Sequence, residues 1–126
     1  MPGTNWATIA WEGDSREVLR QWPREIQRDF GFALLQLQQG QRPALAARPM
    51  KSVGQGVFEL KAADEAVWYR VLYLARVANT IYVLDSFTKQ SRKTEKNDLA
   101  RAKARLSAVK RRLQEEKTDA KRQSGK

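Results

Sequence analysis

Three short apolar segments, rich in β-branched and aromatic residues, lie close together in the middle of the chain. They are residues 57–61 (VFELK), 67–76 (VWYRVLYLAR) and 80–87 (TIYVLDSF). This composition is typical of β-strands, and the turn-like AADEA and VAN between the segments leave room only for short connections. Short connections join antiparallel neighbours. The stretch therefore predicts a mainly antiparallel sheet at the centre of the fold.

The residues before this stretch predict further strands and two helices. Residues 7–11 (ATIAW) are apolar and partly β-branched, as expected for a first strand. Apolar residues at three-to-four spacing in residues 15–22 and 23–39 indicate two amphipathic helices. Residues 41–49 carry two prolines and predict an extended connection, and residues 50–53 (MKSV) predict another short strand.

After the strands, one more amphipathic helix is predicted. Its apolar stripe repeats at three-to-four spacing through Leu99, Ala102, Leu106, Val109 and Leu113, and Thr94 or Asp98 is a candidate cap. Beyond it the chain has almost no apolar residue, which predicts a basic disordered tail over residues 115–126. We therefore expect one α+β domain over residues 1–114, with two N-terminal helices and a C-terminal helix packed on the sheet.

The charge of the chain favours a polyanionic partner. It has 24 Lys and Arg against 14 Asp and Glu, a net charge of +10. Cationic side chains bind phosphates with release of counterions, so RNA, DNA or an acidic protein would all satisfy this surplus.

Two absences restrict the chemistry. With no Cys, disulfide frameworks and thiolate zinc sites are excluded, and with no His the commonest general base is missing. Any acid–base chemistry falls to Lys, Tyr, Glu or Asp. No secretory signal and no apolar run of about 20 residues is seen, so a cytoplasmic protein without a membrane segment is expected.

Three motifs in order resemble a known family. Glu59-Leu60-Lys61, then the Tyr-Arg-x-x-Tyr pattern of residues 69–73, then FTKQSRKT at residues 87–94 precede a helix rich in Ala and Arg. This order resembles the RelE/ParE superfamily of bacterial toxins, specifically its HigB-like, phage-associated branch. The resemblance spans roughly residues 8 to 113, and it implies a small RelE-like fold.

The resemblance also implies a function. Proteins of this branch are toxin components of type II toxin–antitoxin systems, and the chain is similar to ribosome-dependent endoribonucleases that cleave mRNA and inhibit translation. The ribose 2′-hydroxyl would be the nucleophile, so the reaction needs neither a metal nor another cofactor. The implied partners are a cognate antitoxin protein and mRNA on the ribosome. The residues that match catalytic positions of the family are Lys51, Glu59, Lys61, Arg70, Tyr73 and Lys89, and the basic segment adds Arg92, Lys93 and Lys96 as RNA-binding residues.

Two departures and several alternatives accompany this hypothesis. Lys61 stands where Arg is usual in the family, which removes a bidentate phosphate fork, and Gln90 replaces a Lys. A ParE-like toxin that binds gyrase and a non-catalytic basic nucleic-acid-binding module are the other functions considered. For individual residues, Glu59 pairing across the hairpin with Arg70 and Tyr73 packing in the core are the structural alternatives.

Overall fold

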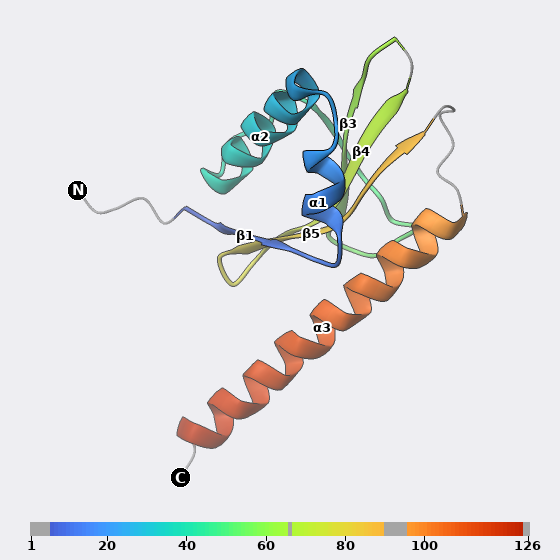
Figure 1. Cartoon of the computed structure of the whole chain (residues 1–126). Coiled ribbons are helices and arrows are strands. Elements are labelled where there is room, and N and C mark those ends of the chain that lie inside the picture. The colour runs from blue at the N-terminus through green and yellow to red at the C-terminus, as the bar shows by residue number, and fades with distance from the viewer. Residues whose placement is uncertain (1–5, 66, 90–95, 125–126) are drawn as a thin grey trace, which may run out of the picture.

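The sequence forms an α+β fold built on one five-stranded sheet. The computed structural model describes residues 6–65, 67–89 and 96–124 (Figure 1). In chain order the elements are β1 (Thr8–Trp11), α1 (Ser15–Arg20), α2 (Arg24–Gln38), β2 (Ala46–Pro49), β3 (Val57–Ala63), β4 (Trp68–Val77), β5 (Thr80–Lys89) and α3 (Lys96–Ser124). Two N-terminal helices, a sheet and a C-terminal helix are the architecture that the sequence predicted.

The sheet is antiparallel except at one edge. Its strand order is β1-β5-β4-β3-β2, and only the β1–β5 pair is parallel. The two-residue loop Ala78-Asn79 joins β4 to β5, and both residues have positive φ, as a tight hairpin turn requires. The predicted strands at residues 57–61, 67–76 and 80–87 are confirmed, with ends that differ by at most two residues.

Helices cover both faces of the sheet, which therefore has two apolar clusters. Leu60, Val71 and Tyr73 pack under α1 and α2 in one cluster. Leu72 and Leu84 pack against α3 in the other. Figure 1 shows α1 and α2 on one side of the strands and α3 crossing the other side. We call these two sides the α2 face and the α3 face. In the described residues, no helix has the length and apolarity needed to cross a membrane.

A β-bulge in β5 changes which side chains face α3. Leu72 is paired with Asp85, but the next residue, Tyr73, is paired with Val83, so Leu84 is the extra residue. Consequently Leu84 packs in the α3 cluster and Asp85 bonds to arginines of α3, although the two residues are adjacent. Strict alternation along a strand would have placed them on opposite faces.

Two local predictions are wrong. Residues 50–53 form a turn, and the strand lies earlier, at β2, within the segment expected to be a connection. The apolar residues of the turn, Met50 and Val53, are buried in the α3 cluster, which explains their type without a strand. Pro49 is tolerated in β2 because that strand is the sheet edge.

The predicted disordered tail is also wrong for most of its length, since α3 continues to Ser124. Residues 114–122 are exposed, so packing does not explain this part of the helix. They consist mainly of Gln, Glu, Lys, Ala and Arg, which are strong helix formers, and no Gly or Pro occurs before Gly125. A lack of apolar residues excluded burial of this segment but did not exclude a helix.

Candidate functional site

Four of the six predicted catalytic residues lie on the α3 face. Lys61 and Arg70 are direct cross-strand partners, and Glu59 is two residues before Lys61 on β3. Lys89 is paired with Trp68, which is two residues before Arg70 on β4. Directly paired residues, and residues two apart on a strand, share a face of the sheet. The structure therefore brings Glu59, Lys61, Arg70 and Lys89 together at the end of the sheet that carries the β3–β4 hairpin.

Glu59 is the centre of a buried ion cluster. Its Oε1 accepts a hydrogen bond from Arg48 Nε at 3.1 Å, and its Oε2 lies 3.3 Å from Arg70 Nη1. The side chains of Glu59 and Arg70 have no exposed surface, whereas that of Arg48 is 58% exposed. The alternative that Glu59 pairs with Arg70 is thus confirmed. Arg48, which sequence analysis overlooked, is the member of this cluster that faces solvent.

Lys61 and Lys89 differ in their surroundings. Lys61 is half-buried, and its Nζ lies 4.9 Å from the centre of the Trp68 ring, a cation–π contact. Lys89 is buried, and its Nζ forms a 2.6 Å ion pair with Asp98 Oδ2 at the start of α3. Lys61 therefore presents a cation beside an aromatic ring, while Lys89 joins the sheet to α3.

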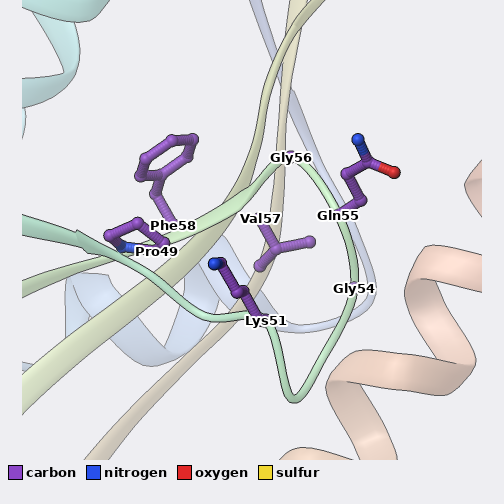
Figure 2. Close-up of a pocket in the computed structure, with 7 residues that line it drawn as sticks. All are labelled: Pro49, Lys51, Gly54, Gln55, Gly56, Val57 and Phe58. Carbon is purple, nitrogen blue, oxygen red and sulfur yellow. The ribbon is translucent and has the colours of Figure 1, made fainter.

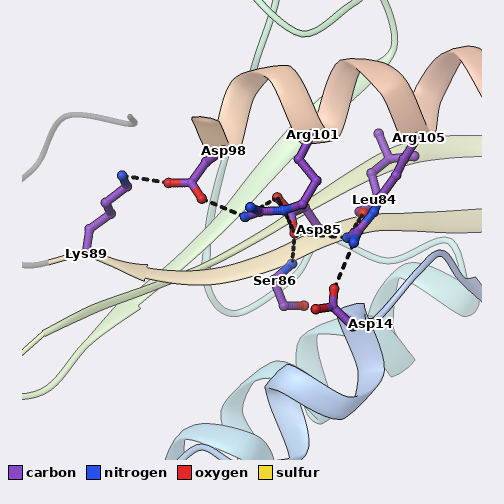
Figure 3. Close-up of polar contacts among 8 residues, drawn as sticks. All are labelled: Asp14, Leu84, Asp85, Ser86, Lys89, Asp98, Arg101 and Arg105. Carbon is purple, nitrogen blue, oxygen red and sulfur yellow. Dashed lines mark hydrogen bonds and ion pairs between the residues drawn. The ribbon is translucent and has the colours of Figure 1, made fainter. Parts of the chain in front are cut away.

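The contact of Lys89 with Asp98 is one end of a polar network that docks α3 on the sheet (Figure 3). Arg101 bonds both Asp98 and buried Asp85, with Nε to Asp85 Oδ2 at 3.0 Å. Arg105 donates to Asp85 and to the Leu84 carbonyl, and its Nη2 lies 2.8 Å from Asp14 Oδ1. This network fixes the start of α3 beside the candidate site.

The pKa values in this network reflect burial and pairing. Burial raises the pKa of the Asp85 carboxyl, and the hydrogen bond from Arg101 opposes that rise. The Arg105 guanidinium beside exposed Asp14 lowers the pKa of that carboxyl. Asp85 and the arginines that bond it were not among the residues predicted from the sequence. The signals were an Asp within an otherwise apolar strand and two Arg four residues apart on one helix.

Tyr73 lies on the opposite face from the other candidates. Its ring is buried in the α2 cluster and stacks on Phe58, with 5.8 Å between ring centroids. Burial raises the pKa of its phenol to about 12, so the hydroxyl keeps its proton at physiological pH. The alternative that Tyr73 is a core residue is confirmed, and a contact with RNA bound on the α3 face is excluded by its position.

We therefore expect Tyr73→Phe to leave any activity of the α3 face unchanged. The Tyr73 ring packs on the α2 face, whereas Lys61 lies on the α3 face. Phe retains the ring that packs on Phe58. If expression of the unaltered chain arrests bacterial growth, the variant at equal protein level should do so to the same degree. A clear loss of growth arrest with unchanged thermal unfolding would show that the phenol acts in the reaction after all.

Lys51 lies at the other end of β3 from Lys61. It is exposed in the turn after β2, next to Val57, which begins β3, and four residues of strand correspond to about 13 Å. It lines a shallow cavity of about 510 Å³ together with Pro49, Gly54, Gln55, Gly56, Val57 and Phe58 (Figure 2). The structure thus does not place Lys51 beside the other predicted cations.

The predicted RNA-binding residues are only partly described. Arg92 and Lys93 lie outside the described residues, and Lys96 is exposed at the first position of α3. Within the described part of the chain, no group of three or more acidic side chains is arranged to hold a metal ion.

Comparison with known proteins identifies the family. The family model described as "Phage derived protein Gp49-like (DUF891)" matches residues 17–107, from α1 into α3. No curated protein and no solved structure gives a significant match to the chain. The matched region contains β2 to β5 and all four residues that meet on the α3 face. The chain therefore belongs to the Gp49-like family of phage-derived proteins.

Proposed function

We propose that this protein is the toxin component of a type II toxin–antitoxin system and inhibits translation as a ribosome-dependent mRNA endoribonuclease. Membership of a phage-derived family and the helix–sheet–helix architecture agree with the resemblance to HigB-like toxins. The observation that supports the proposal most is the gathering of Glu59, Lys61, Arg70 and Lys89 on one sheet face. A cationic surface beside an aromatic ring suits an RNA strand.

The reaction makes modest demands on the protein. The ribose 2′-oxygen forms a bond to the adjacent phosphorus, the bond from phosphorus to the 5′-oxygen breaks, and a proton passes from the 2′-hydroxyl to the departing oxygen. The protein must orient the 2′-hydroxyl and stabilise negative charge on the phosphorane. Cationic side chains on a rigid sheet can supply both requirements without His.

The burial of the candidates assigns them different roles. Lys61 and Arg48 have exposed surface and would contact the phosphate, while the Trp68 ring would support a base. Arg70 has no exposed surface, and its guanidinium holds Glu59, which in turn orients Arg48. In this proposal Arg70 and Glu59 are positioning residues, and Lys89 positions α3 through Asp98.

The cognate partner in this proposal is an antitoxin with acidic side chains that covers the α3 face. A negatively charged surface would match Lys61 and Arg48 electrostatically and would exclude RNA from the same place. In the cell, both the antitoxin and mRNA on the ribosome are met in the cytoplasm.

One observation favours a second candidate, a non-catalytic basic RNA-binding module. Glu59 already neutralises Arg70, and Asp98 already neutralises Lys89, so two of the four cations predicted for catalysis are engaged within the protein. Such a module would bind RNA through Lys61 and Arg48 without cleaving it.

Reconstituted translation separates these functions. The purified protein is added to ribosomes programmed with a defined mRNA, and the 5′ ends of the mRNA are mapped. Cleavage within codons that occurs only when ribosomes are present supports the proposal. Intact mRNA together with RNA binding would support the non-catalytic binding module. In a separate assay, inhibition of DNA supercoiling by gyrase would support a ParE-like toxin.

Lys61→Gln is expected to slow mRNA cleavage by about 10- to 150-fold. Hydrogen bonds to charged groups contribute about 1.5–3 kcal/mol, which corresponds to that range of rate. Stability should change little because Lys61 is half-buried and, within the described residues, its Nζ contacts the Trp68 ring rather than a carboxylate. The matched control is Arg28→Gln, which removes the same charge from an exposed position on α2. Equal cleavage rates for both variants would remove Lys61 from the site.

A further inference from the structure

One flank of α3 carries a line of exposed lysines. Lys96, Lys103, Lys110 and Lys117 follow one another at intervals of seven residues, and all four are exposed. Residues seven apart on an α-helix differ by only about 20° in their direction around the helix axis. At 1.5 Å per residue, the line is about 32 Å long. We call these four residues the lysine line.

The lysine line differs in its pairing from the arginines on the docked side of the same helix. Arg101, Arg105 and Arg112 each bond a carboxylate of the protein body, at Asp85, Asp14 and Glu12 respectively. Within the described residues, none of the four lysines forms an ion pair. Because an α-helix turns by about 100° per residue, the acidic residues of α3 lie at other positions around the helix axis than the line. They are Asp98, Glu115, Glu116 and Asp119. The cations of the line are therefore not needed to hold α3 in place.

We propose that the lysine line binds the phosphate backbone of double-helical RNA. A cationic line that turns by only about 60° over its length on a helix complements the regular phosphates of a duplex. α3 contains no aromatic residue, so it lacks the stacking platform that single-stranded RNA uses. Lysine contacts to phosphate position a protein without reading sequence.

The choice of RNA over DNA rests on the proposed function, in which the protein works among the structured RNA of the ribosome. Only the start of α3 lies beside the candidate site, through the Lys89–Asp98 ion pair, and from Lys103 onward the line continues along the helix away from it. One RNA could therefore lie on the sheet face while the lysine line holds another. The protein would then have two RNA-contacting surfaces with different tasks, one for chemistry and one for docking.

The test compares two triple variants from which the same charge is removed. The line variant carries Lys103→Gln, Lys110→Gln and Lys117→Gln, and the control carries Arg16→Gln, Arg24→Gln and Arg28→Gln at exposed positions of α1 and α2. Gln keeps the helix propensity of Lys, and circular dichroism checks that α3 remains helical. Fluorescence anisotropy measures binding to a labelled RNA duplex of roughly 20 base pairs, longer than the line.

We expect the line variant to bind the RNA duplex at least about tenfold more weakly at about 100 mM salt, with the control close to the unaltered protein. The slope of log affinity against log salt should fall by about 3, one for each phosphate that the variant no longer binds. Equal weakening in both triple variants would show that only net charge matters and would overturn the proposal. Tighter binding to single-stranded RNA, or to a DNA duplex of the same sequence, would also overturn it.

The result is separable from that of the proposed function. Duplex binding needs no cleavage, so the protein could lack nuclease activity and still bind through the lysine line. Conversely, if mRNA is cut on ribosomes by the unaltered protein and equally well by the line variant, whose duplex binding is also unchanged, the lysine line has no role and the nuclease proposal stands.

Discussion

Arg70→Ala is expected to lower the free energy of unfolding by about 3 kcal/mol or more, since removing one partner of a buried ion pair costs about 3–5 kcal/mol. The Arg70 and Glu59 side chains are both 0% exposed, and Arg70 Nη1 lies 3.3 Å from Glu59 Oε2. The variant would leave that carboxylate oxygen buried without its cation. Arg48 still bonds the other oxygen, which places the expected cost toward the lower end of the range.

Urea unfolding monitored by tryptophan fluorescence measures the effect as a lower midpoint. The double variant Arg70→Met, Glu59→Leu is the control, because replacing a buried pair by apolar residues of similar volume is often neutral or stabilising. We expect the double variant to recover most of the stability that the single variant loses. An Arg70→Ala protein that unfolds at the same urea concentration as the unaltered chain would contradict the buried pair.

This expectation governs how activity data on Arg70 should be interpreted. Loss of growth arrest in Arg70→Ala would follow from unfolding even if Arg70 never approached RNA. The informative variant for the reaction is Lys61→Gln, because the Lys61 side chain has exposed surface and forms no ion pair within the described residues. Arg70→Lys adds a test of positioning, because a lysine retains the charge for Glu59 but not the fork geometry.

Leu106→Ala is expected to lower the free energy of unfolding by about 2–5 kcal/mol, the range for truncating a buried leucine. Leu106 is 4% exposed and packs in the cluster that holds α3 against the sheet. Removing its branched end leaves a cavity beneath the helix, next to Gly54. Thermal or urea unfolding measures the loss, and amide hydrogen exchange along α3 shows whether the helix opens before the sheet.

Substitution of Gly54 tests the packing of Leu106 against the turn that contains Gly54. A β-carbon added at Gly54 would overlap Cδ2 of Leu106, so Gly54→Ala alone should destabilise the protein through overpacking, by about 1–3 kcal/mol. In the Leu106→Ala background the same methyl would enter the vacated space. We expect the two substitutions to be non-additive, with the double variant more stable than the sum of the single effects. Simple additivity would argue that Gly54 and Leu106 are not in contact.

The central sheet was predictable because its signals are local. The strands β3, β4 and β5 are joined by short connections, and the period of two along each strand puts Glu59 and Lys61 on one face of β3 and Arg70 on the matching face of β4. The two N-terminal helices were predictable for the same reason. The short strand β2 was not, because its residues form a strand only by pairing with β3 at the sheet edge.

Burial of the candidate site was beyond local reasoning. The sequence of a strand does not show whether its cationic side chain is exposed or buried in an ion pair. The partners of Arg70 and Lys89 come from other elements, so this burial could not be predicted locally. The bulge at Leu84 likewise interrupts alternation without a sequence signal, so the inward position of Asp85 could not be read from a period of two. Tyr73 fitted a family motif, yet its ring belongs to the core.

The parallel edge of the sheet determines the order in which the molecule can be assembled. Thr8, at the start of β1, is held against Thr80 at the start of β5, so β1 leaves the ribosome before the other strands of the sheet and has no partner strand until the last of them, β5, has emerged. During that interval the apolar residues of β1 must stay exposed or associate loosely with α1 and α2. Nascent chains that stall before β5 should therefore be the ones most open to proteolysis at the N-terminus.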